Sequence, residues 1–143
     1  MIKNLVRAKE IRAGGLTNEI GALARLMSFL TNHGINVETI LGYSDQTGRQ
    51  GNIIFITDDN QKSINELINN GYEDIEEKDI IVAEVENKPG ILKNISELLA
   101  GNGLNINYFY CTTCSSGCPA KIVLATSDND MAFKVLNSAC GAG

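Results

Sequence analysis

Residues 85–110 have the sequence VENKPGILKNISELLAGNGLNINYFY, which predicts a strand, a helix and a second strand. Apolar residues recur at helical spacing after Pro89 and Gly90, and a proline suits the first turn of a helix. Gly103 suits the left-handed position that ends a helix. From Leu104 onward the residues alternate in polarity, as in a strand. The predicted helical stripe consists of Ile91, Leu92, Ile95, Leu98 and Leu99.

A second copy of this pattern lies 69 residues earlier. Residues 18–67 align with residues 87–136 without a gap, and twelve of the fifty positions are identical. The same offset pairs residues 11–17 with residues 80–86. An internal repeat of this length indicates two modules of one fold. The identical positions include Asn18 with Asn87, Gly21 with Gly90, Gly34 with Gly103, Asn36 with Asn105, and the Thr-x-Asp-Asn motifs that begin at Thr57 and Thr126.

Each copy predicts the order β-α-β-β-α-β, which is the ferredoxin-like arrangement. We therefore expect an α+β protein of two tandem modules, residues 1–78 and 79–143, with antiparallel sheets and helices on one face. The second copy lacks its last strand, because the residues after Leu136 are few and rich in glycine. Residues 1–9 have no counterpart and include Ile2, Leu5 and Val6. An unpaired sheet edge is a liability, so we expect this segment to supply the missing strand.

Composition argues against several classes of function. The 143 residues carry a net charge of −5, and the basic residues are scattered, which argues against a nucleic-acid partner. No apolar run approaches the roughly 20 residues of a membrane span, and no signal-peptide core is found, so we expect a cytoplasmic protein without a membrane partner. His33 is the only histidine and has no recognisable nucleophile beside it, so we expect no enzyme.

The starts of the two repeated helices are candidate ligand sites. Backbone N–H groups and the helix dipole at such a start attract carboxylates. Asn87 offers a donor and an acceptor, and Gly90 allows a ligand to approach the backbone. These groups are better suited to binding a zwitterion than to catalysis. The alternative is structural: Asn87 caps the helix, and Gly90 serves packing.

Residues 85–92 and 103–107 together resemble an ACT domain, whose pattern is a strand, Pro-Gly, an aliphatic pair, a helix and then Gly-aliphatic-Asn-aliphatic. The first copy is similar, with Ile20 in place of the proline. The chain thus resembles small stand-alone proteins of two tandem ACT modules. This resemblance implies an allosteric regulatory or sensor protein that binds an amino acid, commonly where modules pair.

The resemblance also implies which residues bind the ligand. In the second copy they are Asn87, Lys88, Pro89, Gly90, Ile91, Leu92 and Asn105. In the first copy they are Asn18, Glu19, Ile20, Gly21, Ala22, Leu23 and Asn36. Several strands, such as residues 53–56, are apolar on both faces, so the face without helices is expected to be exposed. Pairing of two chains would cover it, and we expect a homodimer.

Four cysteines give an alternative function. Cys111, Cys114 and Cys118 occupy the hairpin between the second and third strands of the second module, and Cys140 lies near the C-terminus. Clustered cysteines in a cytosolic protein favour metal or redox chemistry. Together they could bind Zn²⁺ or an iron–sulfur cluster. The other possibilities are reduced surface thiols or a reversible Cys111–Cys114 pair.

Overall fold

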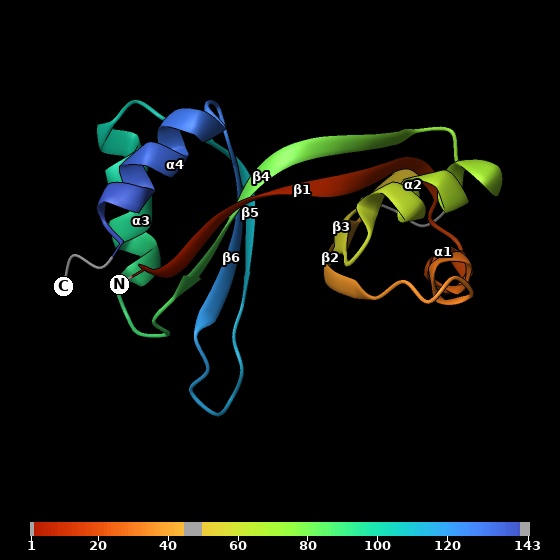
Figure 1. Ribbon diagram of the computed structural model, residues 1–143, viewed down its shortest axis with the longest axis horizontal. Coiled ribbons are helices and arrows are strands. Elements are labelled where there is room, and N and C mark those ends of the chain that lie inside the picture. The colour runs from red at the N-terminus through yellow and green to blue at the C-terminus, as the bar shows by residue number, and fades with distance from the viewer. Residues whose placement is uncertain (1, 45–49, 141–143) are drawn as a thin grey trace. The chain divides into compact units, whose positions relative to one another are not determined.

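The computed structural model describes residues 2–44 and 50–140 (Figure 1). The elements are β1 (Ile2–Thr17), α1 (Ala22–Thr31), β2 (Val37–Tyr43), β3 (Gln50–Thr57), α2 (Asn60–Asn69), β4 (Ile75–Val85), α3 (Ile91–Gly101), β5 (Ile106–Thr112), β6 (Ala120–Thr126) and α4 (Asn129–Ser138). The strands form a sheet in the order β2-β3-β1-β4-β6-β5. This is the α+β fold with tandem ferredoxin-like modules that the repeat predicted. Among the helices of the described segments, none is long and apolar enough to cross a membrane.

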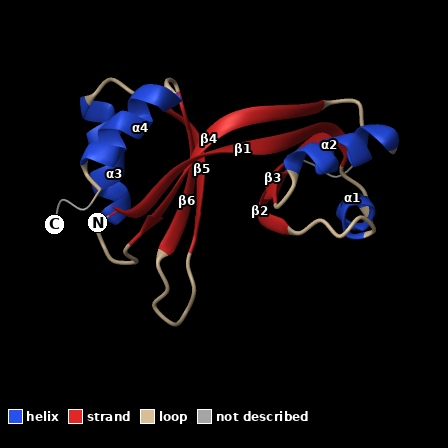
Figure 2. Cartoon of the chain, in the orientation of Figure 1, coloured by secondary structure: helices blue, strands red, loops and turns tan. Residues whose placement is uncertain are grey.

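The chain divides into two compact units. The first unit is Lys9–Lys78, and the second is Met1–Ala8 together with Asp79–Gly143, as far as these residues are described. The first contains α1 and α2, and the second contains α3 and α4 (Figure 2). Residues 2–8 therefore lie in the second unit, whereas the sequence boundary of 1–78 placed them in the first. Because β1 and β4 are long, each contributes a segment to both units.

The N-terminal segment supplies a strand of the second unit. β1 is the hydrogen-bonded neighbour of β4 in the sheet, in the position that a strand after α4 would take. Ile2 is buried in the same cluster as Ile81, Ala83 and Val85 of β4, and Leu5 packs against that cluster. The prediction that residues 1–9 replace the missing strand is confirmed for the described residues 2–8.

A β-bulge corrects the alignment of the two repeats in their first strands. Ile11 pairs with Phe55, whereas Ile81, not Ile80, pairs with the counterpart of Phe55, Leu124. The register of β1 shifts between Ala13 and Leu16, and Gly15 has φ of +66°. An inserted residue of this kind is how a bulge lengthens one strand of a pair. Before the bulge, corresponding residues of the two copies are therefore 70 positions apart. The expected alignment of residues 11–17 with 80–86 is wrong for the residues before the bulge.

Each unit has its own apolar core beneath its helices. In the first unit Leu26 and Leu30 of α1 pack with Phe55 and Leu67. The core of the second unit contains Ile91, Ile95 and Leu99 of α3, together with Ile122, Leu124 and Leu136. Leu92 of the predicted helical stripe and its repeat counterpart Leu23 are instead about half exposed. They occupy the same repeat position, at the first turn of α1 and α3.

The repeated Thr-x-Asp-Asn motif begins α2 and α4. In α2, Asp59 accepts a hydrogen bond from the backbone N–H of Lys62, at 3.0 Å. The side chain of Asn60 accepts one from the Thr57 hydroxyl, also at 3.0 Å. The same contacts recur within residues 126–131 at the start of α4. These identical residues therefore cap helices, a contribution of about 1 kcal/mol per cap.

The sheet face without helices is less exposed than the sequence predicted. Ile54 and Ile56 of β3 and Val123 of β6 are buried. Exposed apolar residues of the sheet lie on the two edge strands, at Ile40 of β2 and Phe109 of β5, and on the central strand β1, at Val6. The argument for a homodimer therefore rests on these exposed residues.

Candidate functional site

Helices α1 and α3 begin without a side-chain cap. Gly21 and Gly90 precede them in the left-handed conformation, with φ of 85° and 92°, and no side-chain capping hydrogen bond is made at either start. Asn87 therefore does not cap α3, which was the structural alternative. By contrast, α2 and α4 are capped by aspartates. A helix start without a capping carboxylate has N–H groups that an external carboxylate can bind.

The uncapped start of α1 opens onto a pocket of about 620 Å³. Its walls are the end of β1, the loop before α1, the first turn of α1, the end of β2 and the start of β3. The polar lining residues are Thr17, Asn18, Glu19, Ser44 and Asn52, and the larger apolar ones are Leu16, Leu23, Ile40, Tyr43 and Ile53. This volume, mostly apolar walls and a few polar groups are typical of small-molecule sites.

Five of the seven residues predicted for the first copy line this pocket, namely Asn18, Glu19, Gly21, Ala22 and Leu23. Ile20 is fully exposed and is not part of the lining. Asn36 lies near a different loop, where its backbone N–H donates to the Asp58 carboxylate at 3.0 Å. One chain therefore does not bring Asn36 to the pocket.

Glu19 is the acidic group of the pocket. Its carboxylate lies 3.7 Å from the Arg25 guanidinium, and both side chains are more than half exposed. Such an exposed pair contributes little to stability and exchanges partners easily. The Glu19 carboxylate can therefore bind a cationic group that enters the pocket.

Sequence reasoning missed the residues that β2 and β3 contribute to the pocket, chiefly Gly42, Tyr43 and Asn52. Gly51 also lines it, and a Cβ there would lie 2.9 Å from the Tyr43 carbonyl oxygen, so no side chain fits without a shift. Glycines at repeat positions that hold Cys111 and Ala120 in the second copy were the available signal. Alone, they did not distinguish a hairpin turn from a pocket wall.

The corresponding loop of the second unit is engaged in contacts within the chain. The Asn87 amide donates to the Thr113 hydroxyl at 3.0 Å, and Lys88 pairs with Glu86 at 2.7 Å. The hydrogen bond from Lys88 holds the pKa of Glu86 below its usual value. Pro89 and Gly90 are exposed, while Ile91 is buried in the core.

A pocket of only about 160 Å³ lies in the second unit between α3 and the strands. Leu92 is the one residue predicted for the second copy that lines it. The backbone N–H of Asn105 donates to the Ser127 hydroxyl at 3.0 Å, beside a different loop. The second copy therefore does not gather its predicted residues around a cavity of ligand size.

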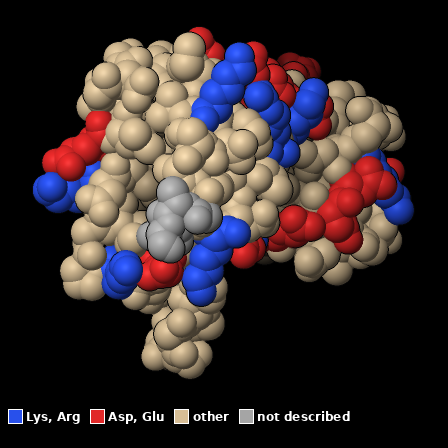
Figure 3. Space-filling view, turned by 60° about the vertical axis from the view of Figure 1, so that its left-hand side comes forward, with Lys and Arg blue, Asp and Glu red and all other residues tan. Residues whose placement is uncertain are grey.

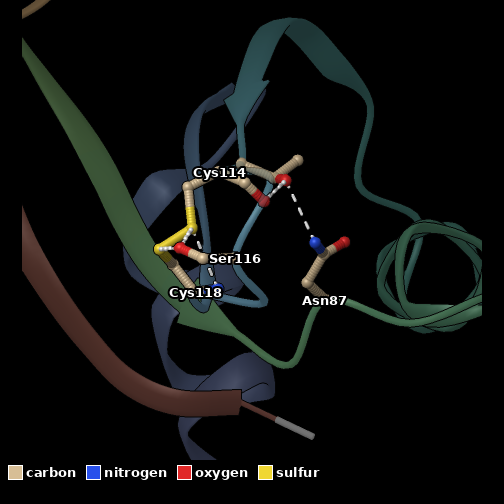
Figure 4. The surroundings of a disulfide bond; sticks show 5 residues. Asn87, Cys114, Ser116 and Cys118 are labelled. Atoms are coloured by element: carbon tan, nitrogen blue, oxygen red, sulfur yellow. Dashed lines mark hydrogen bonds between the residues drawn. A yellow bond between two sulfur atoms is a disulfide. The ribbon is translucent and has the colours of Figure 1, made fainter.

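The four cysteines do not converge on one point. Cys114 and Cys118 form a disulfide in the hairpin between β5 and β6 (Figure 4). Cys111 and Cys140 are free and half-buried, and both pack against the core of the second unit. Across residues 2–44 and 50–140, no group of three or more His, Cys, Asp or Glu side chains could hold a metal ion. The expected zinc or iron–sulfur site is not assembled, and Cys114 pairs with Cys118 rather than with Cys111.

Glu10 is a buried acid that sequence reasoning also missed. Its side chain is fully buried, and neither carboxylate oxygen has a hydrogen-bond partner. Burial raises the pKa of Glu10 from 4.5 to about 7, partly offset by the charge of Lys78. By the offset of 70 that holds before the bulge, its counterpart is Ile80, which is also buried. Glu10 thus occupies a place that the second unit fills with an aliphatic side chain.

Charges are mixed on the surface drawn in Figure 3. Lys and Arg side chains lie among Asp and Glu side chains on this face and do not form a basic stripe. The Nε2 atom of His33 lies 2.6 Å from a carboxylate oxygen of Glu66. These observations match the scattered basic residues of the sequence.

Comparison with known proteins adds to this geometry. The family model of the AHAS small subunit-like ACT domain matches residues 81–138. A search of curated proteins finds no match. Among solved structures, a protein from Bacteroides thetaiotaomicron is similar over 96% of this chain and 91% of its own, with 23% identity and a TM-score of 0.85.

The regulatory subunit of aspartate kinase from Thermus thermophilus is similar over 96% of this chain and 97% of its own, with 16% identity and a TM-score of 0.68. The corresponding subunit from Thermus flavus has the same identity and coverage and a TM-score of 0.63. At these identities the likeness shows the fold. Residues 81–138 are therefore an ACT-like domain, within a chain that has the fold of tandem ferredoxin-like modules.

Proposed function

We propose that this protein is a non-enzymatic regulatory protein that binds a small amino acid in the pocket of the first unit. The observation that carries the proposal is the uncapped start of α1, which opens onto a pocket of about 620 Å³ lined by Asn18 and Glu19. The N–H groups of the first turn would bind the ligand carboxylate, and Glu19 would bind its ammonium group. Leu23 and Ile40 would contact its side chain.

Binding is favoured over catalysis by the chemistry of this lining. The polar groups are hydroxyls, amides and one exposed carboxylate. General acid–base or nucleophilic catalysis needs a nucleophile and a base within hydrogen-bond reach. A zwitterion, in contrast, needs only a site for each of its two charges. The ACT-like segment and the regulatory subunits with the same fold support a regulatory role.

The proposal includes a homodimer in which a second copy covers the pocket. Leu23, Ile40 and Tyr43 line the pocket and are each about half exposed or more. Exposed apolar side chains gathered at one place favour an interface. A second copy would also be the source of Asn36, which the resemblance assigns to the ligand and which its own chain holds elsewhere.

The test is calorimetry with the twenty amino acids on protein shown to be free of ligand. One or a few amino acids should bind, and Asn18→Ala should weaken binding by about 1–3 kcal/mol through the loss of a buried hydrogen bond. Asn69→Ala, on the exposed end of α2, is the matched control and should bind as the wild type does. Absence of heat with every amino acid would exclude the proposed function.

A further inference from the structure

The hairpin between β5 and β6 differs in sequence from its counterpart in the first unit. It carries the Cys114–Cys118 disulfide, whereas the corresponding positions 45 and 49 of the first copy are Asp and Arg. Cys118, Ser116 and Gly117 are exposed, and Gly117 has φ of +79°, a turn conformation that glycine adopts freely. The disulfide therefore lies on the surface, where a reductant can reach it.

A short chain of contacts joins this disulfide to the loop before α3 (Figure 4). The Asn87 amide donates to the Thr113 hydroxyl at 3.0 Å. That hydroxyl donates in turn to the carbonyl oxygen of Cys114, at 3.1 Å. The position of the Thr113 hydroxyl thus depends on the backbone of Cys114, which the disulfide restrains. Asn87 is the counterpart of Asn18, which lines the pocket of the first unit.

The loops before α1 and α3 differ in a way that agrees with this chain of contacts. In the first unit, whose hairpin has no cysteine, the loop opens onto a pocket of about 620 Å³. In the second unit, with the disulfide formed, Asn87 is bound to the hairpin, and the nearby pocket of about 160 Å³ does not include Asn87 among its lining. The side chain of Asn87 is therefore engaged by the hairpin, while residues 87–90 remain exposed.

We propose that the Cys114–Cys118 disulfide is a reversible redox site that withholds the Asn87 side chain from the second amino-acid site by holding Thr113 against it. Reduction frees the hairpin and releases Asn87 for the ligand. This regulation of the second site rests on the function proposed above, whereas the redox control of the loop does not.

The reductant is a dithiol of small-molecule or protein origin. Its first thiolate attacks the exposed Cys118 sulfur, the Cys114–Cys118 bond breaks, and Cys114 leaves as a thiolate that takes up a proton. The second thiol of the reductant then displaces Cys118 and becomes part of a new disulfide within the reductant. Two electrons and two protons pass to the two cysteines. Oxidation reverses these steps with a small disulfide as the electron acceptor.

The surroundings of Cys114 favour its departure. Its sulfur accepts a hydrogen bond from the backbone N–H of Cys118 at 3.0 Å. The Ser116 hydroxyl has one proton to donate and lies 3.3 Å from this sulfur and 3.7 Å from the Cys118 sulfur. The backbone donor stabilises negative charge on the departing Cys114 sulfur, and the hydroxyl can donate to either sulfur.

The neighbouring free thiol does not compete for this disulfide. Cys111 lies in β5, packs against the core, and is half-buried. Burial raises the pKa of Cys111, so it stays protonated and is a poor nucleophile. The exchange is therefore confined to Cys114 and Cys118.

The first test is hydrogen exchange measured by mass spectrometry on the full chain, oxidised with glutathione disulfide or reduced with dithiothreitol. Titration in denaturant should count two thiols in the oxidised protein and four in the reduced protein. The amides of Glu86, Asn87, Lys88 and Gly90 should exchange at least fivefold faster after reduction; Pro89 has no amide hydrogen. Four thiols in both preparations, or equal exchange in two preparations that differ in thiol count, would overturn the proposal.

Two variants separate the contact from the disulfide. Thr113→Val should keep two thiols after oxidation but exchange quickly at residues 86–90 in both redox states. Thr112→Val, at the neighbouring exposed position, is the matched control and should respond as the wild type does. A Thr113→Val protein with wild-type exchange would show that the Asn87–Thr113 contact is not the link.

Calorimetry then measures the effect on the ligand. An amino acid that binds the first unit should bind the second at least tenfold more tightly after reduction, with no change at the first. Equal affinity of the second unit in both states would overturn the control of the site. If no amino acid binds either unit, the proposed function fails, and the exchange comparison alone decides whether the disulfide controls the loop.

Discussion

The two units share one fold but differ at the loop where a ligand would bind. In the first unit the uncapped start of α1 faces a pocket whose far wall includes Gly42 and Gly51. The second unit has Cys111 and Ala120 at these positions, and its loop is bound to the hairpin through Asn87. The fold is held by elements that the two copies share, whereas the site depends on the hairpin, where they differ.

The largest loss of stability should come from removing the N-terminal part of β1, which completes the sheet of the second unit. Deleting residues 1–8 removes Ile2 from a core and exposes the edge of β4. Loss of one buried aliphatic side chain costs about 2–5 kcal/mol, so the second unit should lose at least about 3 kcal/mol. Native-state hydrogen exchange should show the loss at α3 and α4 and little change at α1 and α2. Equal loss in both units would contradict the assignment of this strand.

The next largest effect should come from Glu10, where the second unit has Ile80. The folded protein raises the pKa of Glu10 from 4.5 to about 7, so folding favours the protonated acid. Stability from this residue is present below pH 4.5, falls as the pH rises toward 7, and stays low above it. At about 1.4 kcal/mol per pKa unit the loss is of the order of 3 kcal/mol.

Glu10→Gln removes this titration and Glu10→Ile copies the second unit, so both variants should be more stable than the wild type at pH 8. The measurement is urea unfolding of the three proteins at pH 5 and pH 8. The variant-minus-wild-type difference should grow with pH by roughly 3 kcal/mol. A difference independent of pH would mean that Glu10 has an ordinary pKa in the folded chain.

Gly51→Ala tests the close packing at the pocket wall. The added Cβ would lie 2.9 Å from the Tyr43 carbonyl oxygen and 3.1 Å from the Ser44 Cβ, so the hairpin must shift. Overpacking of this kind costs about 1–3 kcal/mol. Gly42→Ala is the matched control, because its nearest contact would be an ordinary 3.6 Å to Ile53. Thermal unfolding should show a loss for Gly51→Ala alone, and equal stability of the two variants would contradict the close contact.

The smallest effect should be the same in both units. Asp59→Ala and Asp128→Ala each remove a cap from equivalent helices, at a cost of about 1 kcal/mol each. Urea unfolding should give losses that agree within about 0.5 kcal/mol, since the capping contacts have equal lengths. Clearly unequal losses would show that the shared motif has different roles in the two units.

The sequence was sufficient to predict the parts of the fold that depend on local pattern. Helical spacing and the repeat predicted the order of elements, and counting strands predicted that residues 1–9 would fill a gap. The bulge at Gly14–Gly15 could not be predicted, because a glycine pair predicts a break as readily as an inserted residue. The error hid Glu10, since an offset of 69 pairs it with the exposed Asp79.

The site was less predictable than the fold. Asn18 and Leu23 were identified because they lie on one continuous loop and helix, whereas Tyr43 and Asn52 reach the pocket only through strand pairing. Leu23 and Leu92 fit the helical stripe, but the first turn of a helix extends beyond the core beneath it. Cysteine spacing alone could not distinguish a metal site from the possible disulfide pairs. The outcome depends on which cysteines pack against the core, as Cys111 and Cys140 do, and so lie away from the other two.

The measurement that bears most directly on the difference between the units is calorimetry of the oxidised protein with an amino acid that binds. The proposed function and the engagement of Asn87 by the hairpin together predict one site per chain in the oxidised protein, weakened by about 1–3 kcal/mol in Asn18→Ala and unchanged in Asn87→Ala. Two equivalent sites per chain, or a site lost with Asn87→Ala and kept with Asn18→Ala, would contradict this account.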